Sequence, residues 1–170
     1  GAVNVRTGAM RYFDSRDEPL GLEHILATGQ MLARPRSLLL LAETAWHVGQ
    51  GQEARRLVTE ALTALHDIGQ GDLLAEAHRL QGEFLLCQPT PDTALATVCF
   101  QQALTIAQQQ QAKAWELRAA MSLARLWQQQ GQCGAAYELL APVYTWFTEG
   151  FDTADLQEAQ MLLAALADSR

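Results

Sequence analysis

One apolar pattern occurs three times with the same internal spacing, and this repetition constrains the fold more than any other feature of the 170-residue chain. Within each copy, apolar residues recur every three or four positions, which is the spacing of one buried face of an α-helix. A helical stripe that returns at a nearly fixed period is typical of stacked repeats, in which each unit buries its apolar face against the next. The three copies are Ala54, Leu57, Val58, Ala61, Leu62 and Leu65; Ala96, Cys99, Phe100, Ala103, Leu104 and Ala107; and Ala136, Leu139, Leu140, Val143, Tyr144 and Phe147.

Each stripe is interpreted as the second helix of an antiparallel pair. The first helices are predicted upstream, over 37–48 in the first pair, with Leu38, Leu41, Ala42 and Ala45 on the packed face, and over 112–130 in the third. Small residues at matching places, such as Ala42 with Ala54, let the two helices approach closely, and glycines between them make the turns. The middle pair has Gly82 and Ala96 in those roles, with a proline-rich loop over 89–92.

The complete chain is therefore predicted to be all-α, with about eight helices and no strand. Residues 1–17 are expected to be irregular, and 18–170 to form one repeat domain. Within it we expect a partial first pair over 18–34, full pairs over 35–70, 71–111 and 112–151, and a capping helix over 152–170. A terminal cap with a polar outer face is what a stack of repeats needs to stay soluble.

Several classes of function lack their characteristic residues. The net charge of −7 disfavours a phosphate-binding surface, so we expect no nucleic-acid partner. No phosphate-binding loop, paired metal ligands or nucleophile motif occurs, so we expect no enzyme activity, catalytic residue, metal or cofactor. The longest apolar run, 38–42, is too short to cross a bilayer, and three cysteines without a framework fit reduced thiols. We therefore expect a cytoplasmic protein without a membrane segment.

The helix pairs resemble tetratricopeptide repeats. Leu41, Ala42, Ala54 and the Ala61–Leu62 step match the family pattern in the first pair, and Leu123, Ala124 and Ala136 match it in the third. The resemblance implies a right-handed solenoid whose concave wall, formed by the first helix of each pair, binds a protein or peptide. The interval here is 42 and then 40 residues, against a family period of about 34, which implies longer helices or wider turns.

A more specific resemblance covers about residues 75–166. The runs AEAHRLQGEFLL, CFQQALTIAQQQQAKAWELRAAMSLARLWQQQG and LLAPVYTWFTEGFDTADLQEAQMLL are similar to the C-terminal repeat region of large bacterial predicted ATPases. In such proteins these repeats commonly follow a regulatory ATPase module, often with an adenylate/guanylate cyclase domain. The resemblance implies a regulatory tail that binds a partner or its own upstream ATPase or cyclase domain.

Candidate partner-binding residues follow from the concave-face assignment and helical spacing. They combine arginines, glutamates and apolar anchors, which suits an extended peptide or a neighbouring helix. The candidates are Arg36, Leu39, Glu43, Trp46 and His47 in the first pair; Glu76, Arg79, Glu83 and Leu86 in the second; and Arg118, Met121, Arg125 and Gln128 in the third.

Alternative interpretations remain open from the sequence. The charged residues of the groove can pair with one another, for example Arg79 with Glu43 or Arg118 with Glu83, and then imply no ligand. A small molecule held between Trp46 and Met121 would make the domain a sensor. Apolar ends of the stack could instead pair two copies into a homodimer, as in a structural self-association module. An aromatic cluster of Trp146, Phe147 and Phe151 is expected to pack between the last pair and the cap.

Overall fold

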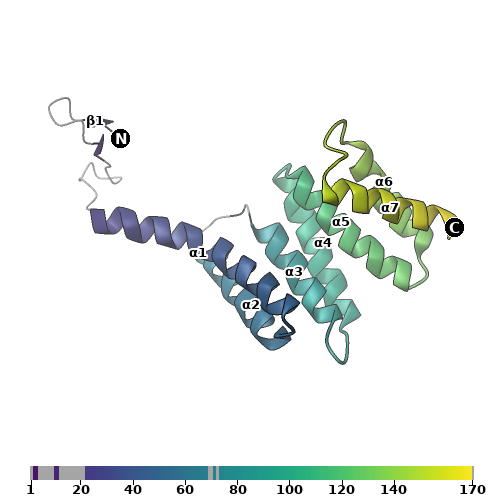
Figure 1. Ribbon diagram of the computed structural model, residues 1–170, viewed down its shortest axis with the longest axis horizontal. Helices are drawn as coiled ribbons and strands as arrows, with labels where there is room; N and C mark the ends of the chain where they lie inside the picture. Colours follow the sequence, from purple (N-terminus) through teal and green to yellow (C-terminus); the bar gives the residue numbers. More distant parts are fainter. Residues whose placement is uncertain (1, 4–9, 12–21, 69–70, 72, 170) are drawn as a thin grey trace.

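The computed structural model describes residues 2–3, 10–11, 22–68, 71 and 73–169, and the side chains discussed below lie within 33–67, 71 and 73–169. These residues form seven helices, shown in Figure 1, and one pair of two-residue strands. The helices are α1 (Leu22–His47), α2 (Gly51–Ile68), α3 (Leu74–Leu86), α4 (Thr93–Gln109), α5 (Lys113–Gln129), α6 (Cys133–Thr145) and α7 (Ala154–Asp168). The all-helical class predicted from the stripes is thereby confirmed.

The N-terminal region contains the only strands among the described residues. β1 (Ala2–Val3) pairs antiparallel with β2 (Met10–Arg11), with Ala2 opposite Arg11. The expectation of an irregular segment over 1–17 without strands is corrected at these four residues, and the rest of that segment lies outside the described residues. Each strand has only two residues, which is too short for an alternating apolar pattern to be recognised in the sequence.

The helices pack in consecutive pairs. The most extensive contacts join α1 to α2, α3 to α4, and α5 to α6, and α7 packs on both α5 and α6. Helix α5 also contacts both α3 and α7 directly, so these three helices lie in a row with α5 in the middle. Helix α1 makes no comparably extensive contact with α3 or α5. The pairing inferred from the stripes is therefore the pairing observed.

The first helix differs from the prediction. Two helices were expected over 18–34 and from 37 onward, whereas α1 is continuous from Leu22 to His47 and passes through Pro35. Its N-terminal part extends away from the other helices (Figure 1). A proline inside a helix removes one backbone hydrogen bond, but the Pro35 ring is fully buried, and its packing offsets part of that cost. Residues 18–21 lie outside the described residues.

The three stripes form the core, but one neighbouring assignment is corrected. Ala54, Ala96 and Ala136 are completely buried. On α1, however, Leu41 was placed on the packed face, whereas it is 55% exposed. Leu39 was expected in the groove and does line a pocket there, but it is only 5% exposed. Residues 38–41 are four consecutive leucines, so the buried face of the helix can be drawn through any of them. Periodicity alone therefore could not decide which leucines face inward.

Glycines shape the pairs in two different ways. Gly49 and Gly131 have φ angles of 81° and 76° after α1 and α5, a left-handed backbone that favours glycine and reverses the chain. Gly82 lies inside α3, where it faces the ring of Phe100 on α4. A Cβ atom built at Gly82 would lie 2.5 Å from Phe100 Cε1. The absence of a side chain there lets α3 and α4 approach closely.

We predict that Gly82→Ala lowers the free energy of unfolding by about 1–3 kcal/mol, because the added methyl overlaps a fully buried ring. Urea denaturation measures the change. Gly134→Ala in α6 is the matched control, since a Cβ there meets nothing within 4 Å, and it should stabilise by up to about 1 kcal/mol through helix propensity. Equal destabilisation by both substitutions would contradict the close-approach role of Gly82.

Candidate functional site

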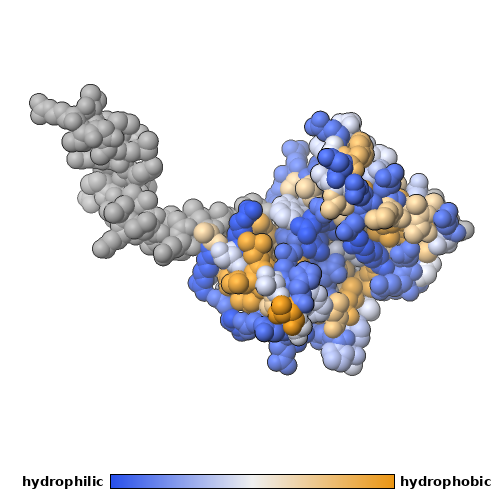
Figure 2. Space-filling view, in the orientation of Figure 1, coloured by the Kyte–Doolittle hydropathy of each residue, from blue (hydrophilic) through white to orange (hydrophobic). Residues whose placement is uncertain are grey.

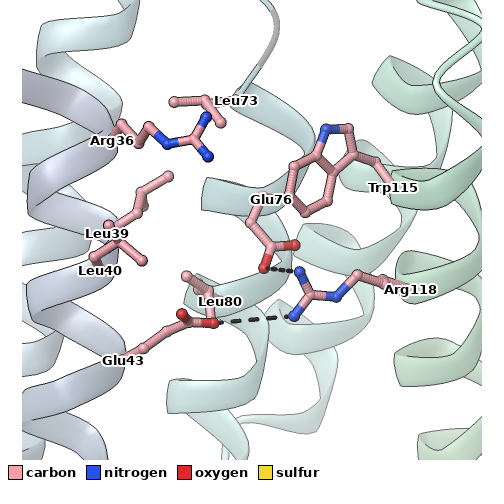
Figure 3. A pocket seen from close by; sticks show the side chains of 9 residues that line it. All are labelled: Arg36, Leu39, Leu40, Glu43, Leu73, Glu76, Leu80, Trp115 and Arg118. Carbon is pink, nitrogen blue, oxygen red and sulfur yellow. Dashed lines mark ion pairs between the residues drawn. The ribbon is translucent and has the colours of Figure 1, made fainter. Parts of the chain in front are cut away.

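A pocket opens on the face formed by α1, α3 and α5, the first helices of the three pairs. Its volume is about 130 Å³ (Figure 3). The pocket is apolar at its base and charged at its rim, and its lining residues are Arg36, Leu39, Leu40, Glu43, Leu73, Glu76, Leu80, Trp115 and Arg118. It lies where the backbones of α1 and α3 stay apart and only their side chains meet. The sequence had placed the binding surface on this set of helices.

The apolar part of the pocket comes from α1, α3 and α5 and from Leu73, the residue before α3. Leu39 and Leu80 are buried at 5% and 4% exposure and belong to the same core cluster of α1, α2 and α3. Leu73 immediately precedes α3 and packs against that cluster. Trp115, from the first turn of α5, is half-buried on the opposite side (Figure 3). The base of the pocket is therefore continuous with the core, which makes it a pre-formed hollow.

The Glu76 carboxylate organises the charged side of the pocket. It is 5% exposed and accepts two hydrogen bonds of 2.8 Å from Arg79, one turn along α3. Arg118 of α5 approaches the same carboxylate, with 3.0 Å between its Nη1 and Glu76 Oε1. A buried carboxylate is stable only when it is paired in this way, and here the pairing joins α3 to α5.

Glu43 and Glu83 extend this network to α1 and along α3. Arg79 lies 3.9 Å from Glu43 and 3.4 Å from Glu83, and Arg118 lies 4.0 Å from Glu43. Ser122 of α5 is buried and donates a hydrogen bond of 2.6 Å to Glu83. The pairing of Arg79 with Glu43 that the sequence suggested is present, whereas Arg118 pairs with Glu76 and Glu43 instead of Glu83. Much of the groove charge is thus satisfied internally.

The protonation of Arg79 follows from these neighbours. Burial would lower the pKa of its guanidinium, but the hydrogen bonds with Glu76 and the charges of Glu76, Glu83 and Glu43 raise the pKa overall. Arg79 therefore stays charged and pairs with Glu43, Glu76 and Glu83, and its side chain is only 11% exposed. A partner cannot reach it without breaking those contacts.

Two further ion pairs continue the charged row from α5 to α7. Arg118 Nε lies 3.9 Å from Asp155, and Arg125 Nη2 lies 2.8 Å from Glu158. Arg125 and Gln128 are both partly exposed but lie beyond the pocket lining, as does the exposed His47 at the end of α1. The predicted groove residues are therefore divided between the pocket and its flanks.

Of the two predicted apolar anchors, one is buried and the other is half-buried. Met121 is 3% exposed and packs in the core of α5, α6 and α7, although it was expected to face the groove. Trp46 is half-buried and stacks on Phe84, with 4.8 Å between ring centroids. The hypothesis of a small molecule between Trp46 and Met121 loses one of its two walls. Helix α5 is covered by α3, α4, α6 and α7. Helical spacing alone therefore predicted an exposed position for Met121, where the neighbouring helices bury it.

Arg36 is the pocket cation without a carboxylate partner among the described residues. Its exposed side chain reaches toward the mouth of the pocket from α1 (Figure 3). Arg118, by contrast, is held by Glu76 and lies over the Trp115 ring, with its Cζ 5.4 Å from the centroid. The sequence identified Arg36 but missed Leu73, Leu80 and Trp115 as lining residues. Trp115 stands one turn before Arg118, a spacing that could have indicated the shared face.

The aromatic corner near α7 is more open than expected. Trp146 is 58% exposed and Phe151 46%, although packing between α6 and the cap was predicted for both. The rings of Trp146 and Phe147 meet edge to face with 5.2 Å between their centroids, and Lys113 Nζ lies 5.6 Å from the centroid of the Trp146 ring. Phe151 contacts Tyr144. Of Trp146, Phe147 and Phe151, only Phe147 packs against the core cluster of α5, α6 and α7.

Other kinds of site find little support in the part of the chain that the structure describes. No three His, Cys, Asp or Glu side chains within it gather closely enough to hold a metal ion. Its helices include none with the length and apolar character needed to cross a membrane. All three cysteines are free; Cys99 is buried as its stripe position predicted, while Cys87 is exposed.

Neither the scan against protein-family models nor the search of curated proteins found a match.

We predict that Glu76→Gln destabilises the fold by about 3–5 kcal/mol, because it leaves Arg79 and Arg118 without their shared buried carboxylate. Thermal and urea denaturation measure the loss. Glu53→Gln is the matched control, since Glu53 pairs with Arg56 on the solvent-exposed side of α2 and should leave stability nearly unchanged. If both substitutions have the same small effect, the network does not hold α3 against α5.

Proposed function

We propose that this chain is a protein-binding module built as a tetratricopeptide-like solenoid, which receives one side chain of a partner segment in the α1–α3–α5 pocket. The observation that carries the proposal is the combination of an apolar base with Arg36 at the rim, which has no ion-pair partner among the described residues. An apolar side chain of the partner would displace water from Leu39, Leu80 and Trp115. A neighbouring carboxylate on the partner would accept hydrogen bonds from the Arg36 guanidinium.

The size of the pocket favours a side chain over a metabolite. Sites for drug-sized ligands usually occupy about 300–1,000 Å³. The pocket here has about 130 Å³, which is room for one apolar side chain. The sensor alternative is further weakened by the burial of Met121. A protein or peptide partner therefore fits the observations better than a small molecule does.

The identity of the partner is proposed from the sequence resemblance to the repeat regions of bacterial predicted ATPases. On that basis the module acts within a cytoplasmic signalling protein and holds its own upstream ATPase or cyclase domain, or a separate protein, in one regulatory state. The mechanism is steric, because a groove that is pre-formed can bind one conformation of the partner better than another.

Peptide selection tests the pocket. A random peptide library displayed on phage is selected against the chain, and the dissociation constants of enriched peptides are measured by fluorescence anisotropy. We expect Arg36→Glu and Trp115→Ala to weaken binding at least about tenfold, the equivalent of about 1.4 kcal/mol, because each removes one half of the recognition surface.

Arg55→Glu is the matched control. Arg55 is also an arginine without an ion-pair partner among the described residues, but it lies on α2, away from this pocket. It should leave peptide affinity within about twofold of the unsubstituted chain, a difference of under 0.5 kcal/mol. The proposal fails if no peptide is enriched, or if Arg36→Glu and Arg55→Glu change affinity equally.

The regulatory role requires its own test. If the gene encodes an ATPase module upstream, its hydrolysis rate is measured in the whole protein with and without Arg36→Glu. A change in rate with Arg36→Glu and none with Arg55→Glu supports a role for the pocket in regulation. An unchanged rate overturns that role and leaves peptide binding as a separate result.

A further inference from the structure

The first helices of successive pairs meet along seams, and the repeat register allows two of these seams to be compared. Ala42 on α1 and Ala124 on α5 are equivalent, because each is fully buried and lies twelve residues before the small residue of its second helix. The residues six positions earlier are then equivalent as well, so Arg36 on α1 corresponds to Arg118 on α5. The α1–α3 seam, which contains the pocket, therefore corresponds to the α5–α7 seam. Figure 2 shows the polar and apolar surface over these helices.

Opposite charges close the α5–α7 seam. Arg118 Nε lies 3.9 Å from Asp155, which stands in the first turn of α7. Further along, Arg125 pairs with Glu158 at 2.8 Å. Leu156 follows Asp155 directly, is 4% exposed and belongs to the core cluster of α5, α6 and α7. Helix α7 thus presents to α5 a carboxylate that is followed at once by a buried apolar residue.

In the α1–α3 seam, Leu73 takes the position that the carboxylate has in the other seam. Asp155 lies 37 residues after Arg118. The residue that lies 37 positions after Arg36 is Leu73. Both line the pocket, and Figure 3 shows the Arg36 side chain pointing toward Leu73. A leucine side chain cannot accept a hydrogen bond from a guanidinium, so this position of the seam leaves the Arg36 charge without a match.

The next position of the α1–α3 seam brings two carboxylates together. Glu76 lies 33 residues after Glu43, which is also the spacing of the ion-paired Arg125 and Glu158. Like charges repel each other, and the two arginines that pair with Glu43 reach it only at 3.9 and 4.0 Å. The backbones of α1 and α3 stay apart, whereas α5 and α7 contact each other. The seam with complementary charges is therefore closed, and the seam without them contains the pocket.

We propose that the partner segment is a helix with the chemistry of α7: a carboxylate in its first turn pairs with Arg36, and the apolar residue that follows enters the pocket. The carboxylate takes at Arg36 the place that Asp155 takes at Arg118. The apolar residue packs over Leu39 and Leu80, in a volume of about 130 Å³. Helix α3 fills the far side of the seam, so the partner helix lies over the mouth of the pocket. This inference rests on the proposed peptide binding and specifies its partner as an acidic amphipathic helix.

A synthetic, fluorescein-labelled peptide of residues 152–168 is the probe, because it contains α7 with its first-turn carboxylate. Fluorescence anisotropy measures its dissociation constant for the intact chain. We expect Arg36→Glu in the chain, or Asp155→Asn in the peptide, to weaken binding at least about tenfold. Gln160→Pro in the peptide should abolish binding, since Gln160 is exposed on α7 and a proline there interrupts the helix.

Leu73 offers a matched pair of variants. Leu73→Asp supplies the carboxylate from the chain itself, so it should compete with the peptide and weaken binding at least about tenfold more than Leu73→Asn does. Leu73→Asn loses the same apolar contact without adding a charge, and circular dichroism checks that both variants are folded. A charge exchange gives a second, independent measurement. A peptide with Asp155→Lys should bind the Arg36→Glu chain at least about tenfold more tightly than it binds the unsubstituted chain.

Three results would overturn the inference. If the peptide does not bind at about 1 mM while phage selection enriches other peptides, the helical partner is wrong and the pocket proposal stands. If Arg125→Glu weakens binding and Arg36→Glu does not, the peptide displaces α7 from its own site. Equal effects of Leu73→Asp and Leu73→Asn, without rescue by the charge exchange, show that no carboxylate is recognised. If neither the selection nor the probe yields a binding peptide, the proposed function fails as well.

Discussion

The shared carboxylate of Glu76 is the interaction on which the binding face depends. A buried carboxylate must be paired, and here one guanidinium comes from the same helix and the other from α5. The pairing holds the first helices of neighbouring pairs at a fixed separation. The guanidinium groups of Arg79 and Arg118 are both engaged in this pairing. Among the described residues, Arg36 is then the pocket arginine without an ion pair. Most of the charged residues predicted to bind a partner therefore pair with one another and hold the helices that form the pocket.

The pocket exists because the seams between helices are not equivalent. Where α3 meets α4, Gly82 lets the Phe100 ring lie against the backbone, and the helices close on each other. Helix α5 also packs directly on both α3 and α7, and its Arg118 and Arg125 pair with carboxylates of α7. Helix α1 does not close against α3 in this way, and the leucines along that edge line a hollow. Because the other neighbouring helices pack closely, the pocket between α1, α3 and α5 has a defined shape.

The amino-acid sequence by itself determined the helical class, the pairing and most of the core, because these depend on local periodicity. Ala54, Ala96 and Ala136 recur at helical spacing and are buried, and Gly49 and Gly131 make the turns. The choice among the leucines over 38–41, the burial of Met121 and the continuity of α1 through Pro35 were decided only by tertiary structure. Each depends on which neighbouring helix covers a given side, and a helix covered on several sides loses the polar and apolar faces that a sequence pattern can reveal. That Arg36 has no carboxylate partner among the residues the structure describes has the same origin, since Glu43 and Glu76 pair with Arg79 and Arg118 instead.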